Sequence, residues 1–115
     1  MGLIEPVEII GKKTISSMAK IDTGAARSCI DEKLAIEVGL GTLIKFVNVK
    51  SATTGKASHV RRPVFRAKIR IKGKKIPVEV SVANRGNLKY KVLIGRDIIH
   101  SNFIVDVEKI HKQTK

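Results

Sequence analysis

The sequence is short of several residue types on which other proteins depend. Its 115 residues include no tryptophan, one tyrosine and three phenylalanines, so few rings are available to stack on nucleic-acid bases. The single cysteine, Cys29, excludes an internal disulfide. No apolar run approaches the ~20 residues that a membrane-spanning helix needs. We therefore expect one soluble domain over residues 1–115, with a polar end at 108–115 that frays.

Acidic residues are also scarce. Lys and Arg number 23 against 10 Asp and Glu, which gives a net charge of +13 and a pI near 10.3. Such a surface attracts anions, whether nucleic acid, acidic lipid or acidic peptide. Residues 1–6 lack the basic and apolar regions of a signal peptide, so we expect a cytoplasmic protein without a membrane partner.

The sequence offers no recognisable metal site. The histidines His59, His100 and His111 lie far apart, and Cys29 has no second thiol beside it. Zinc sites are built from closely spaced Cys and His ligands. We therefore expect neither a metal nor a cofactor.

Short strands and turns dominate the rest of the chain. A hairpin is predicted over residues 7–21, with its turn at 11–13. Asp31 is the predicted N-cap of a short helix that Gly39 ends. Further strands are predicted at 28–30, 43–49, 65–72, 76–82, 92–94 and 103–107, and a second short helical segment at 96–100. This pattern predicts an all-β fold, a small closed β-barrel with one or two short helices.

Two of these strands carry further information. Residues 65–72 alternate apolar and basic side chains, so one face should be core and the other cationic. Pro77 cannot donate a ladder hydrogen bond, which places it at a strand's edge or beginning. The small residues at 50–58 form a loop or hairpin tip, suited to covering a cleft.

The motif with chemical content is Asp22-Thr23-Gly24-Ala25, at the end of the second predicted strand. A carboxylate that acts on water needs a fixed position, and a strand end supplies one. An ordinary Asx turn is the alternative interpretation. About seventy residues later, Gly95, Arg96 and Asp97 follow an apolar strand, and we expect them to pack under the Asp22 loop. Alternatively, Gly95 caps a strand and Arg96 forms a surface ion pair with Asp97.

These blocks resemble the retropepsins, the single-lobe aspartic proteases. The closest resemblance is to the microbial retropepsin-like family labelled "ATP-dependent zinc protease", carried by residues 20–25, 61–64, 93–96 and 103–106. The resemblance implies a homodimeric aspartic endopeptidase with one catalytic Asp22 from each chain. It implies that Thr23, Gly24 and Ala25 support the active loop. The substrate-contact candidates are Arg27, Ser51, Thr53, Thr54 and Gly55.

The chain departs from the retropepsin pattern after Ala25. Where an acid usually follows, Ala26 and Arg27 stand instead, so Arg96 needs another partner. The candidates are Asp31, Asp97 and Asp106. The basic Arg27 suits an acidic peptide, and the family's association with ligases that add glutamates points to acidic protein tails and glutamyl-type amide bonds.

Two non-enzymatic alternatives stay open. One is a basic RNA- or ribosome-binding module on the same fold, and the other is a domain kept only for dimerisation. The anion-binding candidates are Arg61, Arg62, Arg66, Lys68, Arg70 and Lys72. A solvated sheet face explains the same residues, and without interleaved aromatics nucleic acid is the less favoured partner.

Overall fold

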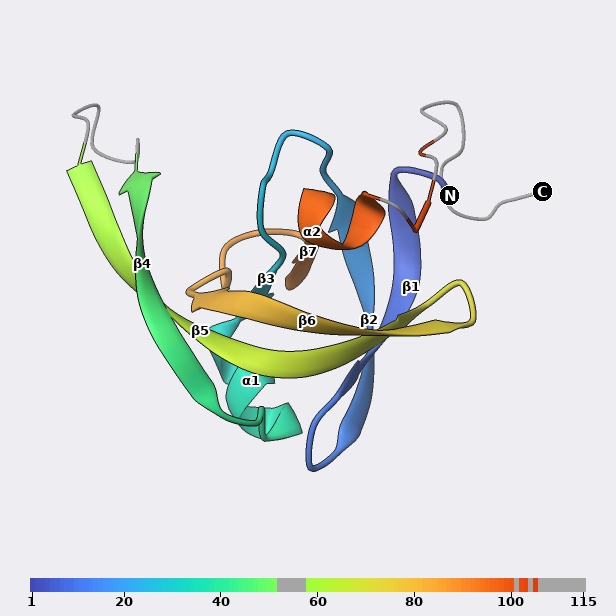
Figure 1. The fold of residues 1–115 in the computed structure, drawn as a ribbon, viewed down its shortest axis with the longest axis horizontal. Coiled ribbons are helices and arrows are strands. Elements are labelled where there is room, and N and C mark those ends of the chain that lie inside the picture. Colours follow the sequence, from blue (N-terminus) through green and yellow to red (C-terminus); the bar gives the residue numbers. More distant parts are fainter. Residues whose placement is uncertain (52–57, 101, 104, 106–115) are drawn as a thin grey trace.

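The computed structural model describes residues 1–51, 58–100, 102, 103 and 105, with the backbone alone at 50, 51, 58 and 59. Figure 1 shows the arrangement of the elements. In chain order they are β1 (Ile4–Ile10), β2 (Thr14–Ile21), β3 (Cys29–Asp31), α1 (Glu32–Val38), β4 (Leu43–Ser51), β5 (Ser58–Ile71), β6 (Lys74–Ala83), β7 (Val92–Ile94) and α2 (Arg96–Ile99).

The strands form a closed barrel, as the sequence predicted. Their order is β1-β2-β7-β3-β6-β5-β4, and an additional antiparallel pairing of β1 with β5 closes the ring. β4 lies outside this ring, paired with the first half of β5. These two strands rise together as an arm on the left of Figure 1. The predicted mainly-β barrel with two short helices is confirmed for the described residues.

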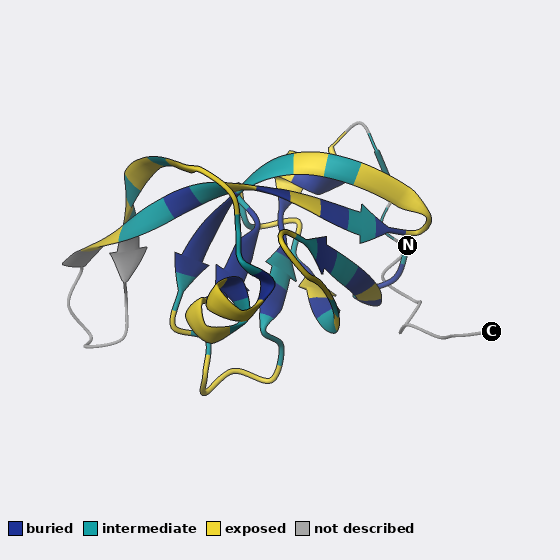
Figure 2. Ribbon diagram, turned by 90° about the horizontal axis from the view of Figure 1, so that it is seen from below, coloured by how far each residue is buried: buried dark blue, intermediate teal, exposed yellow. Residues whose placement is uncertain are grey.

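The core follows the period-two pattern of the strands. In β5, Ala67, Ile69 and Ile71 are buried, whereas the alternating Arg66 and Lys68 are exposed and Arg70 is half-buried. The alternation of dark and light along the strands in Figure 2 reflects this pattern. The predicted division of residues 65–72 into a core face and a cationic face is therefore confirmed.

The capping residues in the sequence predicted the position of α1 correctly. The Asp31 side chain accepts a hydrogen bond from the Lys33 N–H at 3.1 Å, and Gly39 ends the helix in the left-handed conformation with φ 71°. Glycine adopts this conformation without the penalty that a Cβ brings. The β1–β2 turn then packs on this helix end, where the Lys12 N–H donates to the Gly39 carbonyl oxygen at 3.0 Å.

β5 is longer than the sequence predicted. It begins at Ser58 rather than at 65, because its first half pairs with β4. That pairing includes Lys50 with His59 and Ser51 with Ser58. Both ends of the predicted loop at 50–58 are therefore strand, and residues 52–57 lie outside the described part. On one side of β6, Pro77 pairs with Lys68 of β5. On the other side, β3 pairs only with Ser81–Ala83 and does not extend to Pro77, so the predicted edge position is confirmed.

The predicted last strand at 103–107 is not borne out where it is described. Phe103 and Val105 are not in a strand, and the other three positions lie outside the described residues, as does the predicted frayed end at 108–115. None of the helices in the described part is long and apolar enough to span a membrane.

Candidate active site

Asp22 directly follows the last residue of β2 and is half-buried. Its backbone N–H donates to the Ile94 carbonyl oxygen of β7 at 2.8 Å, which continues the β2–β7 pairing by one residue. Its carboxylate Oδ1 accepts the Gly24 N–H at 2.9 Å, and its carbonyl oxygen accepts the Ala25 N–H at 3.2 Å. This is an Asx turn, and the turn itself gives the carboxylate a fixed orientation.

The β7–α2 segment lies directly against the Asp22 loop. The Arg96 backbone N–H donates to the Ala25 carbonyl oxygen at 2.8 Å, and its Nη1 donates to the Thr23 carbonyl oxygen at 3.0 Å. A Cβ at Gly95 would come within 2.8 Å of the Ala25 oxygen and 2.9 Å of the Arg27 carbonyl carbon. Only glycine allows the two backbones to approach so closely.

The partner of Arg96 differs from the carboxylates that the sequence suggested. Its guanidinium binds the carbonyl oxygen of Thr23, and the four ion pairs within the described part do not include it. Asp31 is occupied by the Arg85 and Lys33 N–H groups, and Asp97 by Ser28. Asp106, the third candidate, lies outside the described residues. The alternative interpretation, a surface ion pair of Arg96 with Asp97, is likewise not found among the described ion pairs.

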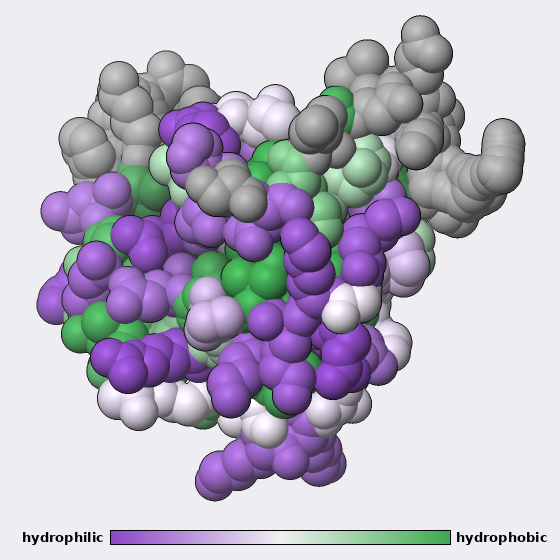
Figure 3. Space-filling view, turned by 45° about the vertical axis from the view of Figure 1, so that its right-hand side comes forward, coloured by the Kyte–Doolittle hydropathy of each residue, from purple (hydrophilic) through white to green (hydrophobic). Residues whose placement is uncertain are grey.

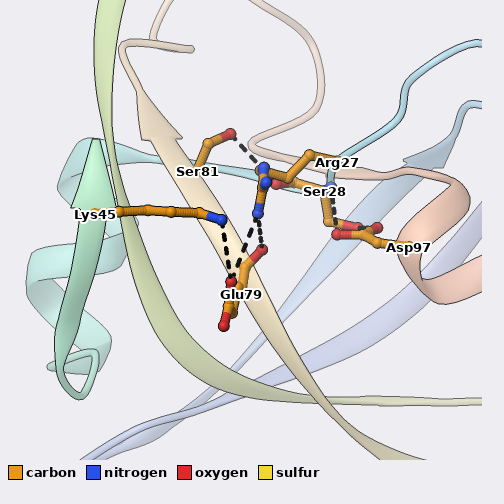
Figure 4. A network of polar contacts seen from close by, with 6 residues as sticks. All are labelled: Arg27, Ser28, Lys45, Glu79, Ser81 and Asp97. Carbon is orange, nitrogen blue, oxygen red and sulfur yellow. Dashed lines mark hydrogen bonds and ion pairs between the residues drawn. The ribbon is translucent and has the colours of Figure 1, made fainter. Parts of the chain in front are cut away.

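Ser28 joins the active loop to α2, a contact that sequence reasoning missed. Its N–H donates to Asp97 Oδ2 at 2.9 Å and its hydroxyl to Asp97 Oδ1 at 2.7 Å. The hydroxyl oxygen in turn accepts the Gly95 N–H at 3.0 Å. Ser28 is fully buried, and Figure 4 shows it facing Asp97. The two residues are 69 positions apart, so no local pattern signals the pair.

Arg27 leaves the same loop toward β6. Its Nη1 lies 3.4 Å from the Glu79 carbonyl oxygen and 4.0 Å from Glu79 Oε1. Lys45 of β4 approaches the same Oε1 at 3.9 Å (Figure 4). Two cations therefore share one carboxylate, which leaves one positive charge uncompensated beside the loop. Of the other substrate-contact candidates, Thr53, Thr54 and Gly55 lie outside the described residues, as does the Ser51 side chain.

Asp31 holds the neighbouring 84–91 turn and has a shifted pKa. Burial raises the pKa of this carboxyl. Hydrogen bonds from the N–H groups of Arg85, Lys33 and Leu34, together with the charge of Lys91, outweigh burial and hold the pKa below its ordinary value of 3.8. Asp31 is thus a charged structural anchor rather than a second acid beside Asp22.

The anion-binding candidates are not equivalent to one another. Arg70 forms an ion pair with Glu8, and Arg61 lies 4.2 Å from the centre of the Phe46 ring. Lys72 lies 3.9 Å from a Glu5 carboxylate oxygen, and Arg62 is half-buried. Arg66 and Lys68 are exposed on β5. Hydrophilic side chains cover most of the face in Figure 3, with hydrophobic surface between them.

The described residues contain no group of three or more His, Cys, Asp or Glu side chains that could hold a metal ion. Within the described part, the Asp22 loop itself carries one carboxylate, that of Asp22. The neighbouring Asp97 is bound by Ser28, and Glu79 is paired with Arg27 and Lys45. The arrangement supplies one oriented carboxylate on a strand-end loop, which is half of the pair that an aspartic protease uses.

A small barrel with this strand-end carboxylate defines the class of retropepsin-like aspartic proteases. The sequence model described as RimB-like, "Retropepsin-like aspartic endopeptidase RimB", matches residues 31–115, and the chain belongs to this family. The matched region begins after Asp22, so it does not itself test the Asp22 loop. The narrower resemblance to the "ATP-dependent zinc protease" family stays a prediction. No curated protein has a significantly similar sequence.

Solved structures share the fold. A Legionella pneumophila protein of unknown function, Lpg0085, is 20% identical with a TM-score of 0.63, and the alignment covers 93% of this chain and 92% of that one. The EIAV protease, solved with the inhibitor HBY-793, is 20% identical with a TM-score of 0.65, covering 84% and 83%. The simian foamy virus protease is 20% identical with a TM-score of 0.58, covering 83% and 90%.

Proposed function

We propose that this protein is an aspartic peptidase that works as a homodimer, with Asp22 of each chain forming the catalytic pair. The observation that carries the proposal is the hydrogen bond of 2.9 Å from the Gly24 N–H to Asp22 Oδ1, which orients the carboxylate at the end of β2. Membership of a family of retropepsin-like endopeptidases supports the same reaction class.

The dimer follows from the chemistry. Peptide hydrolysis by this route needs one carboxylate as base and one carboxylic acid as proton donor. The described acids near the loop are held by other contacts, since Asp97 accepts two hydrogen bonds from Ser28 and Glu79 is paired with Arg27 and Lys45. Asp31 is held by the Arg85 and Lys33 N–H groups. The second acid therefore comes from another copy of the chain, related to the first by a two-fold axis.

The catalytic steps follow from two carboxyl groups in contact. Like charges a few ångström apart cannot both ionise cheaply, so the pair shares one proton. The ionised Asp22 takes a proton from a bound water, which attacks the peptide carbonyl carbon. The protonated Asp22 of the other chain hydrogen-bonds the carbonyl oxygen, and a proton then passes to the leaving nitrogen. Thr23 and Gly24 hold the loop, and Arg96 positions it through the Thr23 carbonyl.

Acidic peptides or glutamyl-type amide tails are the proposed substrates. The net charge of +13 attracts such chains. Beside the Asp22 loop, Arg27 and Lys45 share the single carboxylate of Glu79, which leaves a positive charge for a substrate side chain. We expect Arg27→Ala to raise KM for acidic peptides more than for neutral peptides of the same length.

The proposal is tested with matched acidic and neutral peptides incubated with the protein between about pH 4 and pH 8. Asp22→Asn should lower cleavage by about 10²-fold or more, because it removes the acid–base group. Glu32→Gln, which removes one exposed acid on α1, is the matched control and should cleave normally. Equal cleavage by Asp22→Asn and the unmodified protein would contradict the proposal.

The exposed Arg66 and Lys68 favour the RNA-binding module as the second candidate. In that case the protein and Asp22→Asn would both fail to cleave peptides, and both would bind RNA with a steep salt dependence.

A further inference from the structure

A groove runs along the barrel from the β1–β2 turn, at the end of β2 opposite to Asp22. It has a volume of about 760 Å³ and is lined by the β1–β2 turn, the segment after α1, and the middle of β5 and β6. The turn and α1 lie together at the bottom of Figure 1, and Figure 2 views them from below. β2 begins at Thr14 and Asp22 directly follows its eighth residue, so Thr14 and Asp22 are about 26 Å apart at a rise of about 3.3 Å per residue. The turn end of the groove is therefore far from Asp22, whereas Glu79, at its other end, also contacts Arg27 of the Asp22 loop.

Backbone hydrogen bonds join the walls of the groove. The Lys12 and Lys13 N–H groups donate to the Gly39 and Val38 carbonyl oxygens at 3.0 and 2.9 Å, which fixes the β1–β2 turn on the end of α1. The Gly41 N–H donates to the Arg66 carbonyl oxygen at 3.3 Å, which fixes the next segment on β5. A site that exists before its ligand arrives loses little conformational entropy on binding.

The rim of the groove is cationic. Lys12, Arg66 and Lys68 line it, all three are exposed, and none belongs to an ion pair among the described residues. The stem of Lys12 packs over Gly39, since a Cβ there would meet three Lys12 carbons at 3.1 to 3.3 Å. The one acid in the lining, Glu79, lies opposite Arg66 in the β5–β6 register but is shared with Arg27 and Lys45, so the rim carries a net positive charge.

The floor of the groove is apolar. Ile10, Leu40 and Val78 line it, and each is only half-buried. Partly exposed aliphatic side chains between cations favour a ligand that has both an apolar group and negative charges. A free phosphate or a simple polyanion would leave this floor uncovered.

We propose that the groove is a docking site for an acidic peptide segment of a partner protein, a segment that carries an aliphatic side chain between Asp or Glu residues. The aliphatic side chain covers Ile10, Leu40 and Val78, and the flanking carboxylates face Lys12, Arg66 and Lys68. Charge complementarity selects the acidic segment. A nucleic acid fits less well, since no aromatic residue lines the groove for base stacking. The site needs neither Asp22 nor its reaction.

The test is the binding of a fluorescein-labelled peptide with one leucine between two runs of three glutamates, measured by fluorescence anisotropy with the full chain. The Asp22→Asn variant serves as the background, so that cleavage does not interfere. Lys12→Glu and Lys68→Glu should each weaken binding by about tenfold, because each brings a negative charge against the peptide carboxylates. Replacing the leucine of the peptide by serine should also weaken binding by about tenfold, through loss of the apolar contact.

Lys89→Glu is the matched control. It changes the net charge of the protein by the same amount, but Lys89 lies on the exposed 84–91 turn and does not line the groove. It should weaken binding less than twofold. The proposal is overturned if Lys89→Glu weakens binding as much as Lys68→Glu, if the serine peptide binds equally well, or if a single-stranded RNA oligonucleotide displaces the peptide at lower concentration. Failure of peptide cleavage alone would count against the Asp22 reaction and not against the groove.

Discussion

Ser28→Ala should destabilise the fold more than any surface change, because one buried hydroxyl makes two hydrogen bonds. The substitution removes the donation to Asp97 Oδ1 at 2.7 Å, and bonds to charged groups contribute about 1.5–3 kcal/mol. It also leaves the buried Gly95 N–H without the acceptor that now lies at 3.0 Å, at a cost of about 1–3 kcal/mol. Partial relaxation makes the sum smaller than the parts, so we expect a loss of about 3 kcal/mol.

Thermal unfolding measures this loss. With an unfolding entropy of about 2.1 cal/mol/K per residue, a chain of this length loses about 4 °C in Tm for each kcal/mol, so Ser28→Ala should unfold about 12 °C lower. Protein concentration is held constant, because the proposed dimerisation would make Tm depend on concentration. Ser17→Ala is the control, since the Ser17 hydroxyl makes one contact of 3.4 Å with the Met18 carbonyl oxygen. A fall in Tm of less than about 3 °C for Ser28→Ala would refute the reasoning.

Three further outcomes are expected. Asp31→Asn should cost about 1 kcal/mol in the free energy of unfolding at about pH 7. Because the pKa of Asp31 is lowered in the fold, its stabilising contribution is present above the ordinary value of 3.8 and is lost as pH falls through the folded pKa. Urea unfolding should therefore show the difference between the variant and the unmodified protein shrink as pH falls below 3.8, and a constant difference would contradict this. Gly95→Ala should lower the free energy of unfolding by about 1–3 kcal/mol, because the new Cβ would lie 2.8 Å from the Ala25 carbonyl oxygen. Gly41→Ala is the control, since its Cβ would lie 3.5 Å from the Arg66 carbonyl oxygen, and thermal unfolding should show it to be tolerated. Arg96→Lys keeps the charge but loses the guanidinium hydrogen bond to the Thr23 carbonyl oxygen, so kcat for peptide cleavage should fall about tenfold while Tm shifts by less than about 4 °C. An unchanged kcat would show that Arg96 does not position the loop.

Local chemistry made several parts of the fold predictable. The Asp31 cap and the Gly39 stop act within one helix, and the turn at 11–13 joins adjacent strands. The alternation of apolar and basic residues along 65–72 predicted which side chains are buried, because successive side chains on a strand point to opposite faces of the sheet. Asp22 could be placed at a strand end for the same reason, since the strand pattern ends directly before it.

Contacts between distant segments were not predictable in the same way. Arg27 meets Glu79 across 52 positions, and Ser28 meets Asp97 across 69. The periodicity of a short segment does not indicate such distant contacts, and Ser28 belongs to no recognisable sequence motif. The early start of β5 was missed because its pairing with β4 overrides the weak strand signal of a segment that contains arginines and a proline. The partner of Arg96 was sought among acids, whereas a nearby backbone carbonyl satisfied it.

The central claim is that two copies of Asp22 form one catalytic centre, and subunit mixing tests it most directly. The unmodified protein and Asp22→Asn are unfolded together, refolded at equal concentrations, and assayed on an acidic peptide. If each centre needs Asp22 from both chains, mixed dimers are inactive and the activity per total subunit falls to about one quarter of that of the unmodified protein. A fall to only about one half would mean that each chain acts alone, which contradicts the account.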